Sequence, residues 1–559
     1  MNVVLCWHMH QPEYRDLRTG EFHLPWVYLH AIKDYADMAA HLEAVPQARA
    51  VVNFAPILLE QIEDYIAQIS AYLTGHGAIR DALLAELAEP ALPGDEPARL
   101  RLMQACLRAN PERMIARFEP YQRLATMAEW YRKHPSSLVY ASNQFLADLL
   151  VWYHLSWMAE SVRRSDTRVR ELQDKAYNFS LHDRRQLLEI ILQQLQSLIP
   201  RYRRLSERGQ VELSMSPYAH PIVPLLLDMR CATQAAPEMR LPITTDYPGG
   251  AARVQWQLDR GRVVFERAFG RPSAGLWPSE GGVSEQALTQ FAHSGFRWVA
   301  SGGSVLHNSH KTDESTCRHR VYRFGDAPVD CFFRDDGLSD LIGFTYSDWH
   351  AEDAVGNLIG HMETIADLCP DRNNCLVSII LDGENAWEYY PENGFYFLSD
   401  LYRRLAEHPL LRMTTFEHFL RDSAPQPVQT DKLVAGSWVY GSFSTWIGEP
   451  DKNRAWEILV EAKRSLDEQM AAGRLNEAES AAALRQLAIC EGSDWFWWFG
   501  DYNPPATVNQ FDQLYRMHLA NLYQMINVEA PAYLSEVISR GGGDPARGGV
   551  MRHHSKDGG

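Results

Sequence analysis

Residues 375–390 read CLVSIILDGENAWEYY, and this stretch indicates how the rest of the chain is arranged. It begins with Cys375 to Ile380, an apolar and partly β-branched run of the length typical of a fully buried parallel strand. Polar residues follow at once, among them Asp382 and Glu384. In α/β folds, ligands and catalytic side chains lie at the carboxyl ends of the strands. We therefore expect Asp382 to stand at the functional rim of a sheet or barrel.

A second stretch, earlier in the chain, repeats this arrangement. Residues 275–282 read GLWPSEGG, so Glu280 follows a short apolar segment and lies close to a tryptophan. Two carboxyl groups at the ends of two strands meet the needs of glycosidic bond cleavage, in which one group attacks the sugar carbon and the other protonates the departing oxygen. Glu280 and Asp382 are therefore the predicted catalytic pair.

Seven apolar segments, most of them followed by polar residues or proline, predict seven strands. They are Val3–Trp7, Ala50–Asn53, 209–217, a run that ends at Pro278, Phe296–Ala300, Val329–Phe333 and Cys375–Ile380. Segments of crossover length separate them, as parallel strands require. An open, doubly wound sheet concentrates polar residues at one switch point, whereas here they follow almost every strand. The sequence therefore predicts an α/β fold and favours a barrel over a doubly wound sheet.

The pattern of apolar residues also predicts how the chain divides. Residues from 57 to about 205 show helical spacing, which predicts a mostly helical insertion, and we expect its last helix to end at Pro200. Beyond residue 424 helical patterns dominate again. We expect a catalytic unit over 1–424, a C-terminal helical domain over 425–540 and a disordered tail over 541–559.

Composition limits the partners of the chain. The formal net charge of −17 over 559 residues argues against nucleic acid, because no basic excess exists to release counterions. No apolar run is long enough to span a membrane, and the N-terminus lacks the features of a signal peptide. The eight cysteines show no CxxC spacing, which excludes a zinc knuckle and indicates reduced thiols in a cytoplasm. The sequence does not determine the oligomeric state.

Five motifs occur in order along the chain. They are HMHQP at 8–12, GQVE at 209–212 with PYAHP at 217–221, WPSE at 277–280, LDGEN at 381–385 and SDW at 493–495. This pattern resembles glycoside hydrolase family 57, whose members act on α-glucans, and the resemblance extends from the first strand to about residue 525. Residues 333–335, 338–344 and 446–450 resemble its α-amylase and amylopullulanase branch more than its glucanotransferase or branching-enzyme groups.

The resemblance implies a distorted, TIM-like (β/α)7 barrel with a helical insertion and a C-terminal helical bundle domain. It also implies a retaining hydrolase of α-1,4 glucans such as starch, glycogen or maltooligosaccharides, with activity on α-1,6 bonds left open and no cofactor. Glu280 matches the nucleophile position and Asp382 the acid/base position. Glu280 should then be ionised and Asp382 protonated in the resting complex, before a covalent glycosyl-enzyme forms.

The resemblance also implies a set of residues that bind or orient the glucan. His8, His10 and Gln11 should hydrogen-bond sugar hydroxyls next to the scissile bond. Glu212 and His220 should position either the sugar or the acidic pair. Trp277 and Trp495 are the expected stacking platforms, with Asp494 beside the latter. The alternatives are a turn at a strand end for the N-terminal motif and core packing for the tryptophans.

Three other functions fit parts of the sequence. A 4-α-glucanotransferase would use the same two carboxyl groups, since a sugar hydroxyl can replace water as the acceptor. A metal-dependent hydrolase is suggested by the His-x-His spacing of His8 and His10, with His220 and His361 as further ligands. A glucan-binding protein without catalysis is disfavoured because Glu280 and Asp382 are both present.

Overall fold

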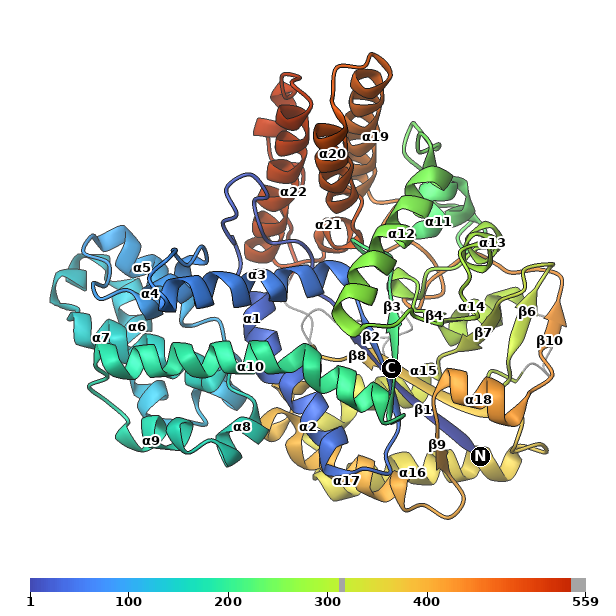
Figure 1. The fold of residues 1–559 in the computed structure, drawn as a ribbon, viewed down its shortest axis with the longest axis horizontal. Coiled ribbons are helices and arrows are strands. Elements are labelled where there is room, and N and C mark those ends of the chain that lie inside the picture. Colours follow the sequence, from blue (N-terminus) through green and yellow to red (C-terminus); the bar gives the residue numbers. More distant parts are fainter. Residues whose placement is uncertain (311–316, 544–559) are drawn as a thin grey trace.

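The computed structural model describes residues 1–310 and 317–543, and its centre is one mostly parallel sheet (Figure 1). Its strand order is β10-β6-β7-β5-β4-β3-β2-β1-β8, with β9 beside β1. The strands are β1 (Asn2–Met9), β2 (Ala50–Phe54), β3 (Val211–Met215), β4 (Gly275–Leu276), β5 (Trp298–Ser301), β6 (Tyr322–Phe324), β7 (Asp330–Phe333), β8 (Leu376–Asp382), β9 (Arg412–Met413) and β10 (Val428–Thr430).

The seven segments predicted to be strands form β1 to β5, β7 and β8. Every neighbouring pair among them in the sheet order runs parallel, and only β6 pairs antiparallel, with β7. The N–H of Asp335, just after β7, donates to the carbonyl of Ser378 in β8 at 2.8 Å. The sheet therefore curls until its distant strands meet, and the predicted α/β class is confirmed.

Alternation along the strands separates the inside of the curled sheet from its outside. A small inner core fills the inside of the curled sheet. It contains Val4, Cys6, Val51, Trp298, Phe332 and Ile380, which pack together with Phe416 and Phe419 of α18 (Phe416–Ser423). Strand register then arranges inward-facing residues in layers. Cys6, Val51, Glu212 and Ile380 share one layer, and His8, Asn53, Ser214 and Asp382 share the next layer toward the carboxyl ends.

Helices cover the outside of the sheet. They are α1 (Trp26–His30), α2 (Ala36–Ala44), α11 (Val223–Leu227), α12 (Gly250–Phe269), α13 (Glu285–His293), α14 (Gly303–Ser309), α15 (Asp336–Asp340), α16 (Ala351–Leu368) and α17 (Phe395–Ala406). Longer helices carry apolar faces onto the main core, as Val254, Leu258 and Phe265 of α12 show.

The chain between β2 and β3 forms a series of helices joined by loops, and it extends to one side of the sheet (Figure 1). Its α-helices are α3 (Pro56–Leu73), α4 (Ala82–Ala88), α5 (Glu96–Ala105), α6 (Glu119–Lys133), α7 (Asn143–Ser156), α8 (Glu160–Ser165), α9 (Thr167–Lys175) and α10 (Leu181–Glu207). The prediction that the last helix ends at Pro200 is wrong. Buried Leu195, Leu198, Tyr202 and Leu205 hold α10 on both sides of the proline, and this packing outweighs its cost of about 3 kcal/mol.

Residues after 424 begin with β10 and a long loop. Helices then follow: α19 (Pro450–Ala471), α20 (Glu477–Cys490), α21 (Ser493–Trp498) and α22 (Pro505–Met525). In Figure 1, α19, α20 and α22 stand side by side on one side of the sheet, and α20 packs along α22. Of the tail predicted to be disordered, residues 544–559 lie outside the described part of the chain. The domain boundary at 424 stays a prediction.

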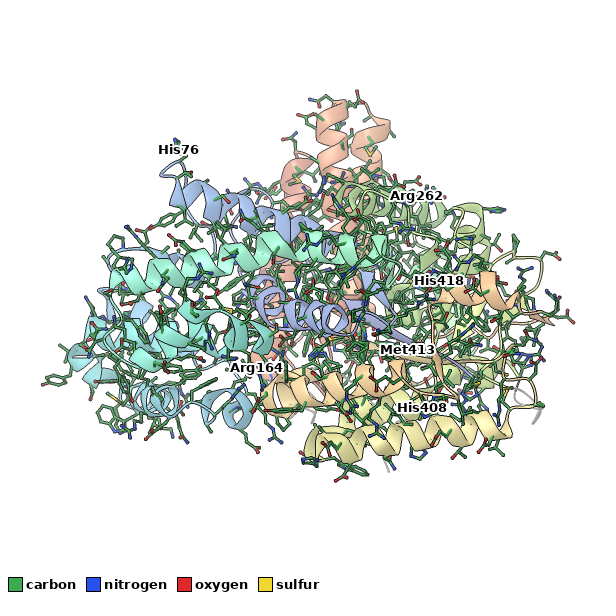
Figure 2. All side chains as sticks on the ribbon, turned by 60° about the horizontal axis from the view of Figure 1, so that its bottom comes forward. His76, Arg164, Arg262, His408, Met413 and His418 are labelled. Carbon is green, nitrogen blue, oxygen red and sulfur yellow. The ribbon has the colours of Figure 1, made fainter. Side chains whose placement is uncertain are left out.

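Arg164 ties the helical insertion to the sheet-covering helices (Figure 2). Its guanidinium lies over the ring of Phe395 in α17 at 4.0 Å and bonds the carboxylate of Glu392. None of the described helices combines the length and the apolar character needed to cross a membrane.

Candidate active site

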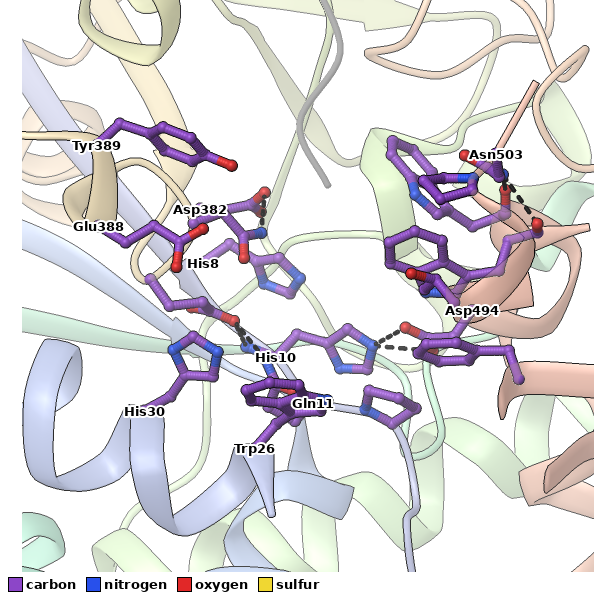
Figure 3. Close-up of a pocket in the computed structure, with 18 of the residues that line it drawn as sticks. His8, His10, Gln11, Trp26, His30, Asp382, Glu388, Tyr389, Asp494 and Asn503 are labelled. Atoms are coloured by element: carbon purple, nitrogen blue, oxygen red, sulfur yellow. Dashed lines mark hydrogen bonds and ion pairs between the residues drawn. The ribbon is translucent and has the colours of Figure 1, made fainter. Parts of the chain in front are cut away.

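A cavity of about 710 Å³ opens at the carboxyl ends of β1 and β8 (Figure 3). Three parts of the chain line it. The strand ends and the loops after them contribute His8, His10, Gln11, Glu280, Asp382 and Glu384; the segment 26–30 and the helical insertion contribute Trp26, His30, Asn110 and Trp157; the chain after 424 contributes Trp438, Asp494, Trp497, Trp498 and Tyr502. Its aromatic walls and convergent polar groups suit a sugar chain.

Glu280 is held in an unusual backbone conformation. Its φ of 58° and ψ of 25° lie in the left-handed region, which a non-glycine residue rarely adopts. The backbone N–H of Trp438 donates to the Glu280 carbonyl at 3.0 Å, and the Trp438 indole N–H donates to the side-chain Oε2 at 3.0 Å. The Ser493 hydroxyl donates to Oε1 at 3.4 Å. The strain and the donors together fix this carboxyl group in the cavity wall.

Asp382 follows from the alternation along β8, because it continues the inward file of Leu376 and Ile380. The amide of Asn385 donates to its Oδ2 at 2.8 Å. Burial raises the pKa of Asp382, and the hydrogen bond from Asn385 together with the charges of His10 and Arg334 opposes that rise. A raised pKa is what the acid/base position requires.

The pKa of Glu280 is raised, like that of Asp382. Burial first, and then the charges of Asp382 and Asp494, raise the pKa of Glu280 to about 8. The donors expected around an ionised nucleophile are present, since Trp438 and Ser493 both lower this pKa, but they do not offset burial. Burial and the two neighbouring carboxyl groups therefore favour the protonated form of Glu280 near neutral pH.

His8 is neutral and presents a ring nitrogen as an acceptor. Asn53 donates its amide to Ser214 and its Oδ1 accepts from Ser216, so the Nδ1 of His8, at 2.6 Å from that oxygen, must donate. Burial, with the charge of His10 adding to it, lowers the pKa of His8 to about 3. The Nε2 of His8 therefore carries a free lone pair and makes no hydrogen bond within the described chain.

His10 and His220 extend the same pattern. The Nε2 of His10 lies 3.0 Å from both oxygens of Asp494 (Figure 3). The Nδ1 of His220 lies 2.9 Å from the Ser493 hydroxyl. Burial and the charges of His10 and His8 lower the pKa of His220 well below its usual value. Nδ1 of His10 and Nε2 of His220 are buried and unbonded in the described residues. His8, which lines the cavity, thus offers an acceptor for a hydroxyl donor, whereas the His220 ring lies behind the cavity wall.

The predicted role of Glu212 at the site is wrong. Register places it one layer below His8 and Asp382, in the inner core. Its carboxyl accepts from the Trp298 indole at 2.6 Å and from the Glu417 N–H at 2.8 Å. Burial raises the pKa of Glu212 to about 7. Glu212 therefore stabilises the barrel interior and does not line the cavity.

The two predicted stacking platforms are also buried. Trp277 has 0% exposure and packs edge-on against Trp438 with ring centres 5.1 Å apart. Trp495 has 1% exposure and donates its indole N–H to the Ile489 carbonyl. In a helix, residue 495 is rotated about 100° from Asp494 and so faces away from the cavity. Core packing, the alternative for both tryptophans, is what the structure shows.

Several cavity residues were not predicted to bind substrate. Trp497 and Trp498 line the cavity on the same face of α21 as Asp494. Glu384 also lines it and accepts from the His10 N–H at 3.2 Å. Only the spacing within α21 could have indicated the tryptophans, because a residue three or four positions away shares a helix face.

Arg334 and Asp335 both form ion pairs, but not with each other. Arg334 pairs instead with Asp336 at 3.2 Å and with Asp340 at 2.9 Å, and it lies at the cavity wall. Asp335 pairs with His319.

The histidines are poorly arranged for a metal ion. His10, His220 and Asp494 have ligand atoms within 4.8 Å of one another, but the rings of His10 and His220 stack with centres 3.8 Å apart and 21° between their planes. A metal lies in the plane of each imidazole that binds it, so stacked parallel rings do not aim at one point. His361, the other suggested ligand, is exposed on α16.

Comparison with known proteins identifies the family. A sequence model described as Glycosyl hydrolase family 57 matches residues 4–431. Searching the curated proteins gives no match. The chain therefore belongs to glycoside hydrolase family 57, a family of glycoside hydrolases and transglycosylases.

Solved structures show the same fold at low sequence identity. A branching enzyme of this family from the archaeon Thermococcus kodakaraensis is 15% identical, with 94% of this chain and 89% of that chain covered and a TM-score of 0.56. A branching enzyme from Pyrococcus horikoshii is 14% identical, with 95% and 96% covered and a TM-score of 0.54. An alpha-amylase from Thermotoga maritima is 13% identical, with 96% of both chains covered and a TM-score of 0.52.

Proposed function

We propose that the protein is a retaining glycoside hydrolase of α-1,4 glucans, with Glu280 as nucleophile and Asp382 as acid/base. The observation that carries this proposal is that the two carboxyl groups, from different strand ends, line one aromatic-walled cavity. Glu280 would attack the anomeric carbon while Asp382 protonates the departing oxygen. Asp382 would then take a proton from the acceptor that releases the glycosyl-enzyme.

The surroundings of each carboxyl group support this division of roles. Trp438 and Ser493 donate to Glu280 and favour its ionised form, which is the form that attacks. Asp382 accepts a hydrogen bond from the neutral amide of Asn385, and burial favours its protonated form. His8, His10 and Asp494 would hold sugar hydroxyls, and Trp438 and Trp498 would contact the sugar faces.

The scaffold supports further parts of the proposal. We infer that the curled sheet acts as a (β/α)7 barrel and that residues 425–540 form a C-terminal helical domain closing the cavity. The eight cysteines are free thiols, which supports a reducing compartment such as the cytoplasm. The α-amylase and amylopullulanase branch remains our assignment within the family.

Transglycosylation to another glucan is the second candidate. It shares the intermediate, and it is favoured by the largely aromatic cavity wall, which can hold an acceptor sugar and limit water. Chromatography of products from amylose, pullulan and maltotriose separates the two activities. Net release of short sugars means hydrolysis, whereas redistribution into longer chains means transfer.

The nucleophile is tested directly with Glu280→Gly. Removing the carboxylate should abolish turnover, and azide should restore glycosyl release as an azide adduct because a small anion fits the space left by the side chain. Proton NMR should show the wild-type product released with retained anomeric configuration. Inverted product, or wild-type turnover by Glu280→Gln, would refute the assignment. A chelator should leave activity unchanged, whereas its loss would support the metal hypothesis.

A further inference from the structure

A cysteine, a histidine and an aspartate lie in line where β7 and β8 meet, away from the cavity. The Sγ of Cys317 lies 4.0 Å from Nδ1 of His319, and Nε2 of His319 lies 2.9 Å from Oδ2 of Asp335. Cys317 is partly exposed. A thiol beside an imidazole that is oriented by a carboxylate is the arrangement that activates cysteine nucleophiles.

Two more thiols continue the line. The N–H of Leu376 donates to the His319 carbonyl at 2.7 Å, which places the start of β8 against this segment. The thiol of Cys375 interacts with Cys317 on one side and with Cys369 on the other. Cys369 is partly exposed and Cys375 is buried. An activated thiol therefore has a second thiol within reach.

We propose that Cys317 and Cys375 form a peroxide-sensitive pair, in which Cys317 is the reacting thiolate and Cys375 closes a disulfide with it. This inference does not depend on the proposed glucan chemistry. Transient disulfides are the form in which disulfides occur in reducing compartments, so the pair fits a chain of free thiols.

The charges around the pair favour a thiolate at Cys317. Hydrogen bonds from Cys375 and then His319 lower the pKa of Cys317 to about 4. Burial lowers the pKa of His319, but its bonds to Asp335 and Cys317 raise it overall. Burial instead raises the pKa of each of five other thiols: Cys6, Cys106, Cys231, Cys331 and Cys490.

Other charged groups nearby are mostly positive. The charge of Arg318 acts on Asp335. At the far end of the line, the α-amino group of Met1 interacts with Cys369 and Cys375, and with Arg372 and Arg412. These positive charges also favour the thiolate form of Cys317 over its thiol form.

The reaction balances with peroxide as the oxidant. The Cys317 thiolate attacks one peroxide oxygen, the O–O bond breaks, and the released hydroxide takes a proton from the His319 imidazolium to leave as water. The Cys375 sulfur then attacks the sulfenic acid, the S–S bond forms and the S–O bond breaks, and a second water leaves with the Cys375 proton. The two thiols are oxidised by two electrons and the peroxide is reduced.

The geometry favours a disulfide over a zinc site. Tetrahedral zinc brings all of its ligand atoms within about 4 Å of one another. Among the described residues, the group whose ligand atoms converge within 4.8 Å is His10, His220 and Asp494, and the three thiols and His319 do not form such a group. They are arranged as a line.

Trypsin makes the test selective, because it places the three thiols on separate peptides. Cleavage after Lys311, Arg318, Arg334, Arg372 and Arg403 gives 312–318 with Cys317, 335–372 with Cys369 and 373–403 with Cys375. The full-length protein is treated with graded peroxide, blocked with N-ethylmaleimide, digested and analysed by mass spectrometry. We expect 312–318 linked to 373–403 as the first oxidised product, while the five buried thiols other than Cys375 stay reduced. Equal oxidation of all thiols would overturn the proposal.

Activation of Cys317 is tested by the pH dependence of its alkylation by iodoacetamide. Its rate should change less than about threefold between about pH 5.5 and about pH 7.5, whereas an ordinary thiol changes about a hundredfold. His319→Gln should shift this dependence toward that of an ordinary thiol, a change that a purely structural histidine would not cause. Cys375→Ser should leave Cys317 as a dimedone-reactive sulfenic acid. An ordinary pH dependence in the wild type, or one zinc per chain that is lost in Cys317→Ser, would refute the proposal.

Discussion

The hydrogen bond from Trp438 to Glu280 should control the acid limb of the pH–activity profile. The indole N–H lies 3.0 Å from Oε2 and stabilises the carboxylate. A hydrogen bond to a charged group contributes about 1.5–3 kcal/mol, and one pKa unit corresponds to about 1.4 kcal/mol. Trp438→Phe should therefore raise the pKa of Glu280 by about 1–2 units. Because the attacking form is ionised, activity should disappear at correspondingly higher pH.

The assay is the pH dependence of kcat/KM on a short maltooligosaccharide, since that ratio reports ionisations of the free enzyme. Trp498→Phe is the matched control, because Trp498 lines the same cavity but stacks on Phe511 at 4.9 Å. The control should change KM and leave the acid limb in place. An unmoved acid limb in Trp438→Phe, with a folded protein and measurable activity, would refute the assignment of Glu280 as the ionised nucleophile.

Four further substitutions test the site and its surroundings. Asp494→Asn removes a negative charge that raises the pKa of Glu280, so the acid limb should move to lower pH. The value of kcat/KM should fall about 10–100-fold, because a neutral amide binds His10 more weakly than the carboxylate does. Glu212→Gln should leave that profile unchanged. In the wild type, the raised pKa of Glu212 should reduce the free energy of unfolding by up to about 3 kcal/mol between about pH 4.5 and pH 7, and denaturant titrations should show this loss abolished in the variant. Trp495→Phe should lower stability by about 1–3 kcal/mol at unchanged KM, whereas Trp498→Ala should raise KM.

The sequence predicted those parts of the fold that depend on local pattern. Apolar runs ended by polar residues predicted all seven parallel strands, and Asp382 follows from the inward alternation of its own strand. Glu212 was misplaced although the same rule applies to it. Glu212 and Ser214 of β3, and Ser216 just after it, lie on the same face at increasing height toward the rim. Counting back from Pro217 would therefore have shown that Glu212 lies deepest.

Contacts between distant segments could not be predicted in this way. Trp438 reaches Glu280 across 158 positions of the chain, and His10 reaches Asp494 across 484. Neither Trp438 nor Asp494 lies within residues 4–431, the part that matches the family model. The matched part therefore supplies both carboxyl groups, while residues beyond it supply the indole donor and the second negative charge that shift the pKa of Glu280 in opposite directions. It follows that relatives with the same two carboxyl groups can differ in pH optimum through this C-terminal segment alone. Replacing residues 432–540 should then move the pH profile while the stereochemical outcome stays retained.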